Sequence, residues 1–198
     1  RTNKYLVEHG FSTSFFHGGL EQKEREAALY RFSNGSANIL VSTDLASRGL
    51  DIPDIDNIVH YHMPESEDGY IHRVGRTARW EAQGRAFFLL GPEEHIPEYV
   101  DADVEDYEMP SEDELPAPAK PKMATIYIGK GKKDKISKGD ILGFLCKKGG
   151  LQSSEIGKID VNDRYAYAAI ARPKLRSVLN QVRGEKIKGV KTIVEEVR

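Results

Sequence analysis

The sequence has a single cysteine, Cys146, among 198 residues. One thiol cannot form an intrachain disulfide and cannot build a cysteine-based zinc site, so the sequence excludes both of these stabilising features. The apolar run that precedes Cys146 favours a buried, unreactive thiol on a helix face over a catalytic one. The sequence also lacks an apolar run near the roughly 18 residues of a membrane span, and no signal peptide is visible. We therefore expect a cytoplasmic protein.

A phosphate-binding loop of the G-x-x-x-x-G-K-[ST] type is also missing. The segment at residues 129–133 holds glycine and lysine, but it lacks the required spacing and the following Ser or Thr. If the protein acts on a nucleoside triphosphate, this chain must therefore supply another part of the site.

Charge is segregated along the chain, although the whole chain has a net charge of only −2. Residues 1–100 carry 10 Lys and Arg against 15 Asp and Glu, residues 101–122 carry 2 against 8, and residues 123–198 carry 17 against 8. The acidic, proline-containing middle lacks apolar periodicity, which predicts a semi-extended linker between two domains. The basic last segment predicts a nucleic-acid-binding domain.

An arginine-rich run, HRVGRTAR, covers residues 72–79. Its guanidinium groups, on Arg73, Arg76 and Arg79, are permanently charged and can each hold two phosphate oxygens. Three such groups repel one another unless a polyanion lies among them. The alternative is a solvated basic helix end, and this run alone does not decide between the two.

A second polar run, STDLASRGLDIP, covers residues 42–53 and follows the apolar segment NILV. That segment predicts a buried parallel strand, and loops at the carboxyl ends of such strands are where open α/β sheets bind ligands. Thr43 can bond a phosphate oxygen, Gly49 allows close backbone approach, and Asp51 can accept from a ribose hydroxyl. A turn with a helix cap is the alternative. Two such runs on adjacent strand–helix units favour one shared ligand site.

Together these runs resemble the fifth and sixth motifs of DEAD-box RNA helicases, and HGGLEQKER at residues 17–25 resembles the segment of that family that contacts the RNA backbone. The three matches come in the family's order within about the first hundred residues. A histidine at position 72 is similar to the DEAD-box branch of the family, since related DEAH-type helicases usually carry glutamine at the corresponding position. Ala78 stands where many members have glycine, but all three arginines remain in place.

The resemblance implies roles for the first domain in a site for ATP with Mg²⁺. An N-terminal lobe would supply the phosphate loop and the Asp-Glu-Ala-Asp run, both of which this sequence lacks. Arg76 and Arg79 would reach the γ-phosphate, and Asp51 would reach the ribose. His72 and Arg73 would bridge to the other lobe. One RNA strand would be held by its sugar-phosphates at Gly18, Gly19, Gln22, Arg25 and Thr43.

Residues 1–100 are accordingly expected to form a parallel-sheet, RecA-like helicase lobe that is truncated at its N-terminus, because the chain opens with Arg1 inside a helix. Ser66 is the expected N-cap of its last helix, and Gly10 and Gly75 are the expected helix ends. Phenylalanines in the strands are expected to be core, and His60 and His62 are expected at strand ends or on the surface. The helices are expected at residues 1–9, 21–32 and 66–74, and the strands at 13–17, 38–42, 57–61 and 85–90.

Residues 123–198 predict the order βαββαβ of an RNA recognition motif (RRM). The first helix should begin after Ser137, with Ile141, Leu142 and Leu145 turned inward, and the second should begin at Pro173. The strands are expected at residues 125–129, 156–161, 164–170 and 190–197.

Alternation along the strands places three tyrosines, Tyr127, Tyr165 and Tyr167, on one open sheet face, where bases can stack. Packing of tyrosines across strands is the alternative, and the internal glycine usual in the third strand is missing. Basic residues beside this face would neutralise phosphates, although ordinary solvated charge would explain the lysines equally well. These basic residues are Lys130, Lys132, Lys133, Lys135 and Arg164.

The pairing of a DEAD-box second lobe with this tail resembles the DbpA-type branch of bacterial helicases. The resemblance implies an ATP-dependent RNA helicase, with RNA-stimulated ATPase activity, that opens short duplexes. Its tail would bind a hairpin of ribosomal RNA during large-subunit assembly. Because the phosphate loop is missing, this chain alone is expected to be inactive. A non-enzymatic RNA-binding or annealing protein, and a helicase-like lobe that serves as a protein-interaction platform, remain as alternatives.

Overall fold

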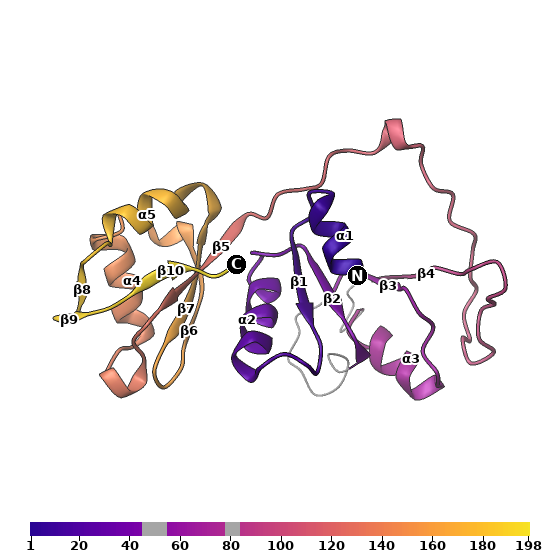
Figure 1. Ribbon diagram of the computed structural model, residues 1–198, viewed down its shortest axis with the longest axis horizontal. Helices are drawn as coiled ribbons and strands as arrows, with labels where there is room; N and C mark the ends of the chain where they lie inside the picture. The colour runs from indigo at the N-terminus through magenta and orange to yellow at the C-terminus, as the bar shows by residue number, and fades with distance from the viewer. Residues whose placement is uncertain (45–54, 78–83) are drawn as a thin grey trace. The chain divides into compact units, whose positions relative to one another are not determined.

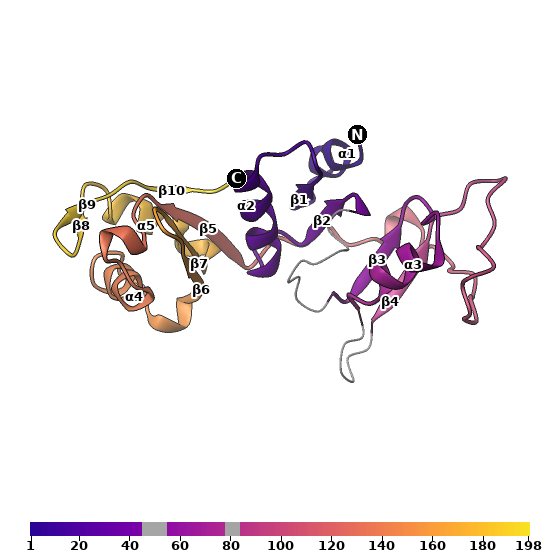
Figure 2. The same cartoon turned by 90° about the horizontal axis from the view of Figure 1, so that it is seen from below.

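The computed structural model describes residues 1–44, 55–77 and 84–198 (Figures 1 and 2). These residues divide into two compact units. The first unit contains residues 1–15, 21–41 and 118–198, and the second contains residues 16–20 and 42–117. Within the described ranges, every helix is too short or too polar to span a lipid bilayer.

The chain begins with helix α1 (Thr2–Glu8), strand β1 (Thr13–Phe16), helix α2 (Gln22–Ser33) and strand β2 (Ile39–Ser42). Gly10, with φ of 86°, follows α1 where the sequence predicts the helix to end. The backbone N–H of Ile39 donates to Ser12 O at one end of the pair, and that of Thr43 donates to Phe16 O at the other. Strands β1 and β2 therefore run side by side in the same direction.

The second unit contains strand β3 (Asn57–His60), helix α3 (Glu67–Val74) and strand β4 (Arg85–Phe88). Strands β3 and β4 pair in parallel, with His60 opposite Phe88. Ser66 Oγ accepts from Gly69 N at 3.1 Å, which confirms the predicted N-cap. In the described residues the expected alternation of strands and helices is thus present as two parallel strand pairs.

One expectation about burial in this region is wrong. Phe16 is 4% exposed, but Phe15 is 42% exposed, because successive strand side chains point to opposite faces. His60 ends strand β3, as expected, and its side chain is only 1% exposed.

Residues 89–122 form the connection to the tail, and their described structure holds no helix or strand apart from the short 3₁₀ turn η2 (Glu112–Glu114). This agrees with the predicted linker. The beginning of the connection nevertheless packs against the second unit. The hydroxyl of Tyr99 donates to the carbonyl of Pro64, and the ring of Tyr107 meets that of Phe87 edge-on at 5.4 Å.

The tail forms a four-stranded antiparallel sheet in the order β10-β5-β7-β6. Its helices α4 and α5 cover one face (Figure 1). The predicted order βαββαβ is confirmed, with an added two-stranded hairpin, β8–β9, before the last strand. The elements are β5 (Met123–Ile128), α4 (Lys138–Lys147), β6 (Ile156–Val161), β7 (Ala166–Ala171), α5 (Leu175–Gln181), β8 (Lys186–Ile187), β9 (Val190–Lys191) and β10 (Val194–Glu196), with 3₁₀ turns η3 (Lys132–Asp134), η4 (Ser153–Glu155) and η5 (Arg172–Lys174).

The tail has its own apolar core between the sheet and these helices. Ser137 caps α4 through a reciprocal pair of hydrogen bonds with Asp140, as the sequence predicts. Leu142 was expected to face inward, but it is 37% exposed and Phe144 is buried in its place, because residues 141, 144 and 145 share one helix face. The core residues are Ile126, Ile128, Ile136, Ile141, Phe144, Leu145, Leu151, Val161, Ala166, Ala168, Ile170, Val178, Val182 and Ile187.

Candidate functional site

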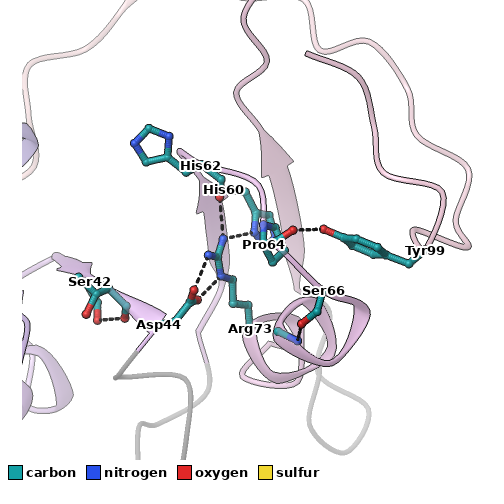
Figure 3. Close-up of polar contacts among 10 residues, drawn as sticks. Ser42, Asp44, His60, His62, Pro64, Ser66, Arg73 and Tyr99 are labelled. Carbon is teal, nitrogen blue, oxygen red and sulfur yellow. Dashed lines mark hydrogen bonds and ion pairs between the residues drawn. The ribbon is translucent and has the colours of Figure 1, made fainter.

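Arg73 lies at the centre of a polar cluster in the second unit (Figure 3). Its Nε lies 2.5 Å from Asp44 Oδ1 and its Nη2 lies 3.0 Å from Asp44 Oδ2, which makes a bidentate ion pair. Its Nη1 donates to His62 O at 2.8 Å and lies 3.3 Å from His60 Nδ1. One guanidinium therefore joins helix α3 to the segment 42–44 and to the end of strand β3.

His60 is a buried titratable group of this cluster. Its ring stacks on that of Phe88 with centroids 4.9 Å apart, and it lies 5.9 Å from the ring of Tyr70. Burial lowers the pKa of His60, the Arg73 cation lowers it further, and Asp44 opposes both effects. The imidazole is therefore neutral near pH 7.

Two other residues of the HRVGRTAR run are described on α3 and just beyond it. His72 Nε2 lies 3.3 Å from Asp68 Oδ1, one helical turn earlier, on an exposed surface. Arg76 is partly buried, and its backbone carbonyl accepts from Ile55 N at 3.1 Å. Arg79 and Asp51, which the resemblance assigns to ATP, lie outside the described residues.

The turn after β1 carries the two glycines assigned to the RNA backbone. His17 Nδ1 accepts from Gly19 N at 3.0 Å, and a Cβ on Gly19 would lie 3.1 Å from the His17 ring, so glycine keeps this turn tight. The hydrogen bond from Thr43 N to Phe16 O places Thr43 beside the same end of β1. The structure therefore brings Gly18, Gly19 and Thr43 to one end of a parallel strand pair, exposed to solvent.

Gln22 and Arg25 lie on the first turns of α2 and bind each other. Arg25 Nη2 donates to Gln22 Oε1 at 3.0 Å, and Gln22 Nε2 donates to Glu26 Oε1 at 3.1 Å. The second carboxylate oxygen of Glu26 accepts from the hydroxyl of Tyr165 at 2.8 Å. These two RNA-contact candidates thus belong to one polar row that reaches the tail sheet within the first unit.

The three tyrosines of the tail lie together, as alternation predicts. Ring centroids are 5.8 Å apart for Tyr127 and Tyr165, 6.0 Å for Tyr127 and Tyr167, and 5.4 Å for Tyr165 and Tyr167. Their sheet face is not fully open, since Tyr30 of α2 stacks on Tyr167 at 5.2 Å and Tyr167 is only 3% exposed. Burial, followed by the Glu26 charge, raises the pKa of Tyr167 to about 12.

Polar contacts also join α2 and the residues after it to this sheet face. The hydroxyl of Tyr30 donates to the carbonyl of Lys158, and Asn34 Nδ2 donates to Thr125 Oγ1 at 2.8 Å. Ser36 Oγ lies 2.8 Å from the same Thr125 hydroxyl, and both residues are buried. The sequence did not predict this packing. Tyr30 near the end of α2 and Asn34 just after it belong to no repeating pattern of apolar residues that would mark a buried helix face.

Five basic residues of the tail lie at one end of its sheet, in the turns that follow β5 and β6. Backbone N–H groups of Lys132 and Lys133 donate to the carbonyls of Asn162 at 2.9 Å and Asp163 at 2.8 Å. A Cβ on Gly131 would lie 2.2 Å from Asn162 O, so only glycine allows this approach. The lysine-rich turn is thereby fastened beside Arg164. The side chains of Lys132, Lys133, Lys135 and Arg164 are exposed, and Lys130 is partly buried near Asp134.

Comparisons with known proteins find matches for both parts of the chain. Residues 1–81 match the helicase conserved C-terminal domain, and residues 125–196 match the DbpA RNA-binding domain. The ATP-dependent RNA helicase DbpA of Escherichia coli K12 is 38% identical over 188 residues, which cover 93% of this chain and 41% of that protein. DbpA of Bacillus subtilis 168 is 30% identical over 211 residues, which cover 93% of this chain and 44% of that protein.

Among solved structures, the E. coli DEAD-box protein SrmB bound to regulator of ribonuclease activity A is 41% identical, with a TM-score of 0.42. That match covers 44% of this chain and 51% of the SrmB chain. The present chain spans about two fifths of the length of the two DbpA relatives. The chain therefore combines a match to the helicase conserved C-terminal domain with a match to the DbpA RNA-binding domain, and it is similar to the two DbpA helicases over 93% of its length.

Proposed function

We propose that this chain works with an N-terminal helicase lobe as an ATP-dependent RNA helicase, called here the two-lobe protein. ATP with Mg²⁺ would bind between the lobes, mainly through the N-terminal one. In this chain Arg76 and Arg79 would face the γ-phosphate, and Asp51 would face the ribose. Arginines placed in this way contribute roughly 10³–10⁵ to phosphoryl-transfer rates.

The observation that carries this proposal is the bidentate pair between Arg73 and Asp44. Asp44 belongs to the run that holds Thr43 and leads to Asp51, and Arg73 belongs to the helix that leads to Arg76. A rigid link between these two segments would let RNA binding on one affect nucleotide contacts on the other.

RNA would be held at the lobe by its backbone, at Gly18, Gly19, Gln22, Arg25 and Thr43. Sugar-phosphate contacts carry no sequence information, so this grip would accept any RNA strand. Closure of the two lobes would bend the bound strand and separate a short duplex, and hydrolysis would reopen the cleft.

Target choice would then fall to the tail. We propose that it binds an RNA hairpin, and that this hairpin is ribosomal and is bound during large-subunit assembly in the cytoplasm. The exposed cations at this end of the tail sheet support an electrostatic grip on phosphates. Tyr127 and Tyr165 are partly exposed and would offer ring faces for base stacking.

The test compares this chain with the two-lobe protein in a steady-state ATP hydrolysis assay, with and without RNA. We expect no turnover from the chain alone and RNA-stimulated turnover from the two-lobe protein. Turnover from the chain alone would contradict the proposed division of the site. A two-lobe protein that binds RNA without hydrolysing ATP would favour the non-enzymatic alternative.

A further inference from the structure

The contact between His60 and Arg73 has no role in the function proposed above, and it depends on which nitrogen of the His60 ring carries the proton. An arginine side chain has five N–H donors and no acceptor. The 3.3 Å approach of Arg73 Nη1 to His60 Nδ1 is therefore a hydrogen bond only if Nδ1 carries a lone pair. The neutral ring must then hold its proton on Nε2.

The surroundings of His60 keep this ring nitrogen aimed at Arg73. The planes of the His60 and Phe88 rings differ by only 12°, and the two residues are direct neighbours in the β3–β4 register. Tyr70, on α3, completes a cluster of three rings, 5.9 Å from the imidazole and 6.3 Å from the ring of Phe88. Because the buried imidazole contacts both aromatic rings, it cannot turn away without breaking these contacts.

The opposite nitrogen shows that packing alone does not explain a histidine here. His60 Nε2 is buried and has no hydrogen-bond partner among the residues that the structure describes. A buried N–H without a partner is unfavourable, and an apolar side chain would avoid it. What an apolar side chain cannot supply is an acceptor for Arg73.

Arg73 needs this acceptor because its guanidinium binds two different segments of the chain at the same time. Its Nε and Nη2 hold Asp44, while Nη1 is held by His60 and by the carbonyl of His62 (Figure 3). The second set of contacts fixes the rotation of the guanidinium plane, and with it the bidentate geometry on Asp44.

We infer that His60 is a positioning residue, whose Nδ1 orients Arg73 on Asp44 and so holds the segment 42–44 and helix α3 in one arrangement. In the two-lobe protein this arrangement would couple RNA binding to ATP hydrolysis, and that part of the inference rests on the proposed function.

The same geometry implies sensitivity to acid. The charged and titratable groups that face His60 are Arg73 and Tyr70 from α3 and Asp44 from the segment after β2. A protonated His60 offers no lone pair and sets a second cation against Arg73. Because burial lowers the pKa of His60 below the ordinary histidine value of 6.5, the link should weaken as pH falls through this lowered pKa.

Two variants separate positioning from packing. In His60→Asn the amide oxygen takes the place of Nδ1 as an acceptor and cannot titrate, whereas His60→Leu fills the space without an acceptor. The first readout uses this chain alone and follows hydrogen exchange of the Arg73 Nε–H by NMR. We expect slow exchange in the wild type and in His60→Asn, and exchange about tenfold faster in His60→Leu, since a hydrogen bond to a charged group is lost.

The second readout uses RNA-stimulated ATP turnover of the two-lobe protein. We expect His60→Leu to lower turnover at saturating RNA and to raise the RNA concentration for half-stimulation, and His60→Asn to stay near the wild type. As pH falls from 6.5 through the lowered pKa of His60, the wild type should lose stimulation more steeply than His60→Asn.

The outcomes distinguish the inference from the function it rests on. A wild-type protein without turnover contradicts the proposed function and leaves the exchange experiment to decide on His60. Equal exchange and equal turnover in the wild type and His60→Leu overturn the inference. If His60→Leu does not fold, a pH profile of His60→Asn that matches the wild type overturns it instead.

Discussion

The side chain of Arg73 is only 20% exposed, so most of its guanidinium N–H groups need acceptors from the protein. Asp44, 29 residues earlier in the chain, supplies two of them, and the end of β3 supplies the others. The described contacts of Arg73 lie within the second unit. No local pattern could have shown these contacts, since the partners meet only in the fold. The contact with another lobe that the resemblance implies for Arg73 stays a prediction.

Because Asp44 is paired with Arg73, neutralising Asp44 should destabilise the protein more than neutralising an exposed carboxylate elsewhere. Asp44→Asn should lower the free energy of unfolding by about 1 kcal/mol, because the pair is bidentate but its carboxylate is half exposed. Asp68→Asn, which removes the exposed partner of His72, should change it by less than about 0.5 kcal/mol. Urea unfolding of both variants at pH 7.5 checks this, and equal losses would contradict it.

His60 predicts a pH dependence of stability. Its pKa is lowered in the folded chain from the ordinary 6.5, so the unfolded chain binds the proton more readily. The stabilisation from neutral His60 is complete above pH 6.5 and is lost as pH falls from there toward the folded pKa. The difference in unfolding free energy between the wild type and His60→Asn should therefore shrink or reverse on acidification. A difference that is constant from pH 7.5 to 5 would rule out this assignment.

At the scale of elements, the local patterns of this sequence carry much of the fold. Ser66 and Ser137 begin helices because their hydroxyls accept from the backbone three residues on, which is a short-range effect visible in sequence. The βαββαβ order of the tail follows equally from alternation and turn residues. Burial was predicted less well, as Phe15 and Leu142 show, because it depends on which face meets a neighbouring element.

Helix α2 illustrates that limit most clearly. Tyr30 is its one buried residue among those described, and its ring packs on Tyr167 of the tail sheet. The predicted aromatic platform is consequently covered in part by α2.

The packing of α2 predicts that Tyr30→Ala lowers the free energy of unfolding by about 3 kcal/mol, since a buried aromatic ring is removed. Tyr5→Ala is the matched control, because Tyr5 is 60% exposed on α1, and its effect should stay within about 0.5 kcal/mol. Denaturant unfolding monitored by circular dichroism measures both. Similar small effects would show that α2 does not pack on the tail sheet in solution.

The lysine-rich turn predicts a matched pair of glycine substitutions. Gly131→Ala should destabilise the tail by about 1–3 kcal/mol, because the new methyl would overlap Asn162 O. Gly143→Ala lies within α4 with open space around it and should stabilise the tail by about 0.5–1 kcal/mol. Thermal unfolding of the two variants should shift in opposite directions, and a neutral Gly131→Ala would contradict the close approach.

At the scale of the whole molecule, charge differs strongly between the first hundred residues and the tail. The first hundred residues are acidic overall and carry cations at defined positions, whereas the tail carries a general excess of Lys and Arg. The charge distribution and the motifs therefore indicated, from the sequence alone, the two domain families that the chain matches. The residues assigned to RNA and ATP remain predictions, and Arg79 and Asp51 lie outside the described structure.

The basic end of the tail sheet predicts the salt dependence of RNA binding by the tail. Replacing Lys132, Lys133 and Lys135 with Gln should weaken binding of a hairpin and reduce the slope of log affinity against log salt by about 2, if each lysine contacts one phosphate. Lys4→Gln, on exposed α1, should change neither quantity. Fluorescence anisotropy titrations at several salt concentrations measure the slope. An unchanged slope in the triple variant would show that these three lysines do not contact RNA phosphates.

The most direct test of the central claim is the RNA-stimulated ATP turnover of the two-lobe protein carrying Arg76→Ala, with Arg85→Ala as an exposed control on β4. If this chain completes a nucleotide site, Arg76→Ala loses about 10²-fold or more in turnover while still binding RNA, and Arg85→Ala stays near the wild type. Near-normal turnover in Arg76→Ala would show that this lobe does not contribute the arginines that act on the triphosphate.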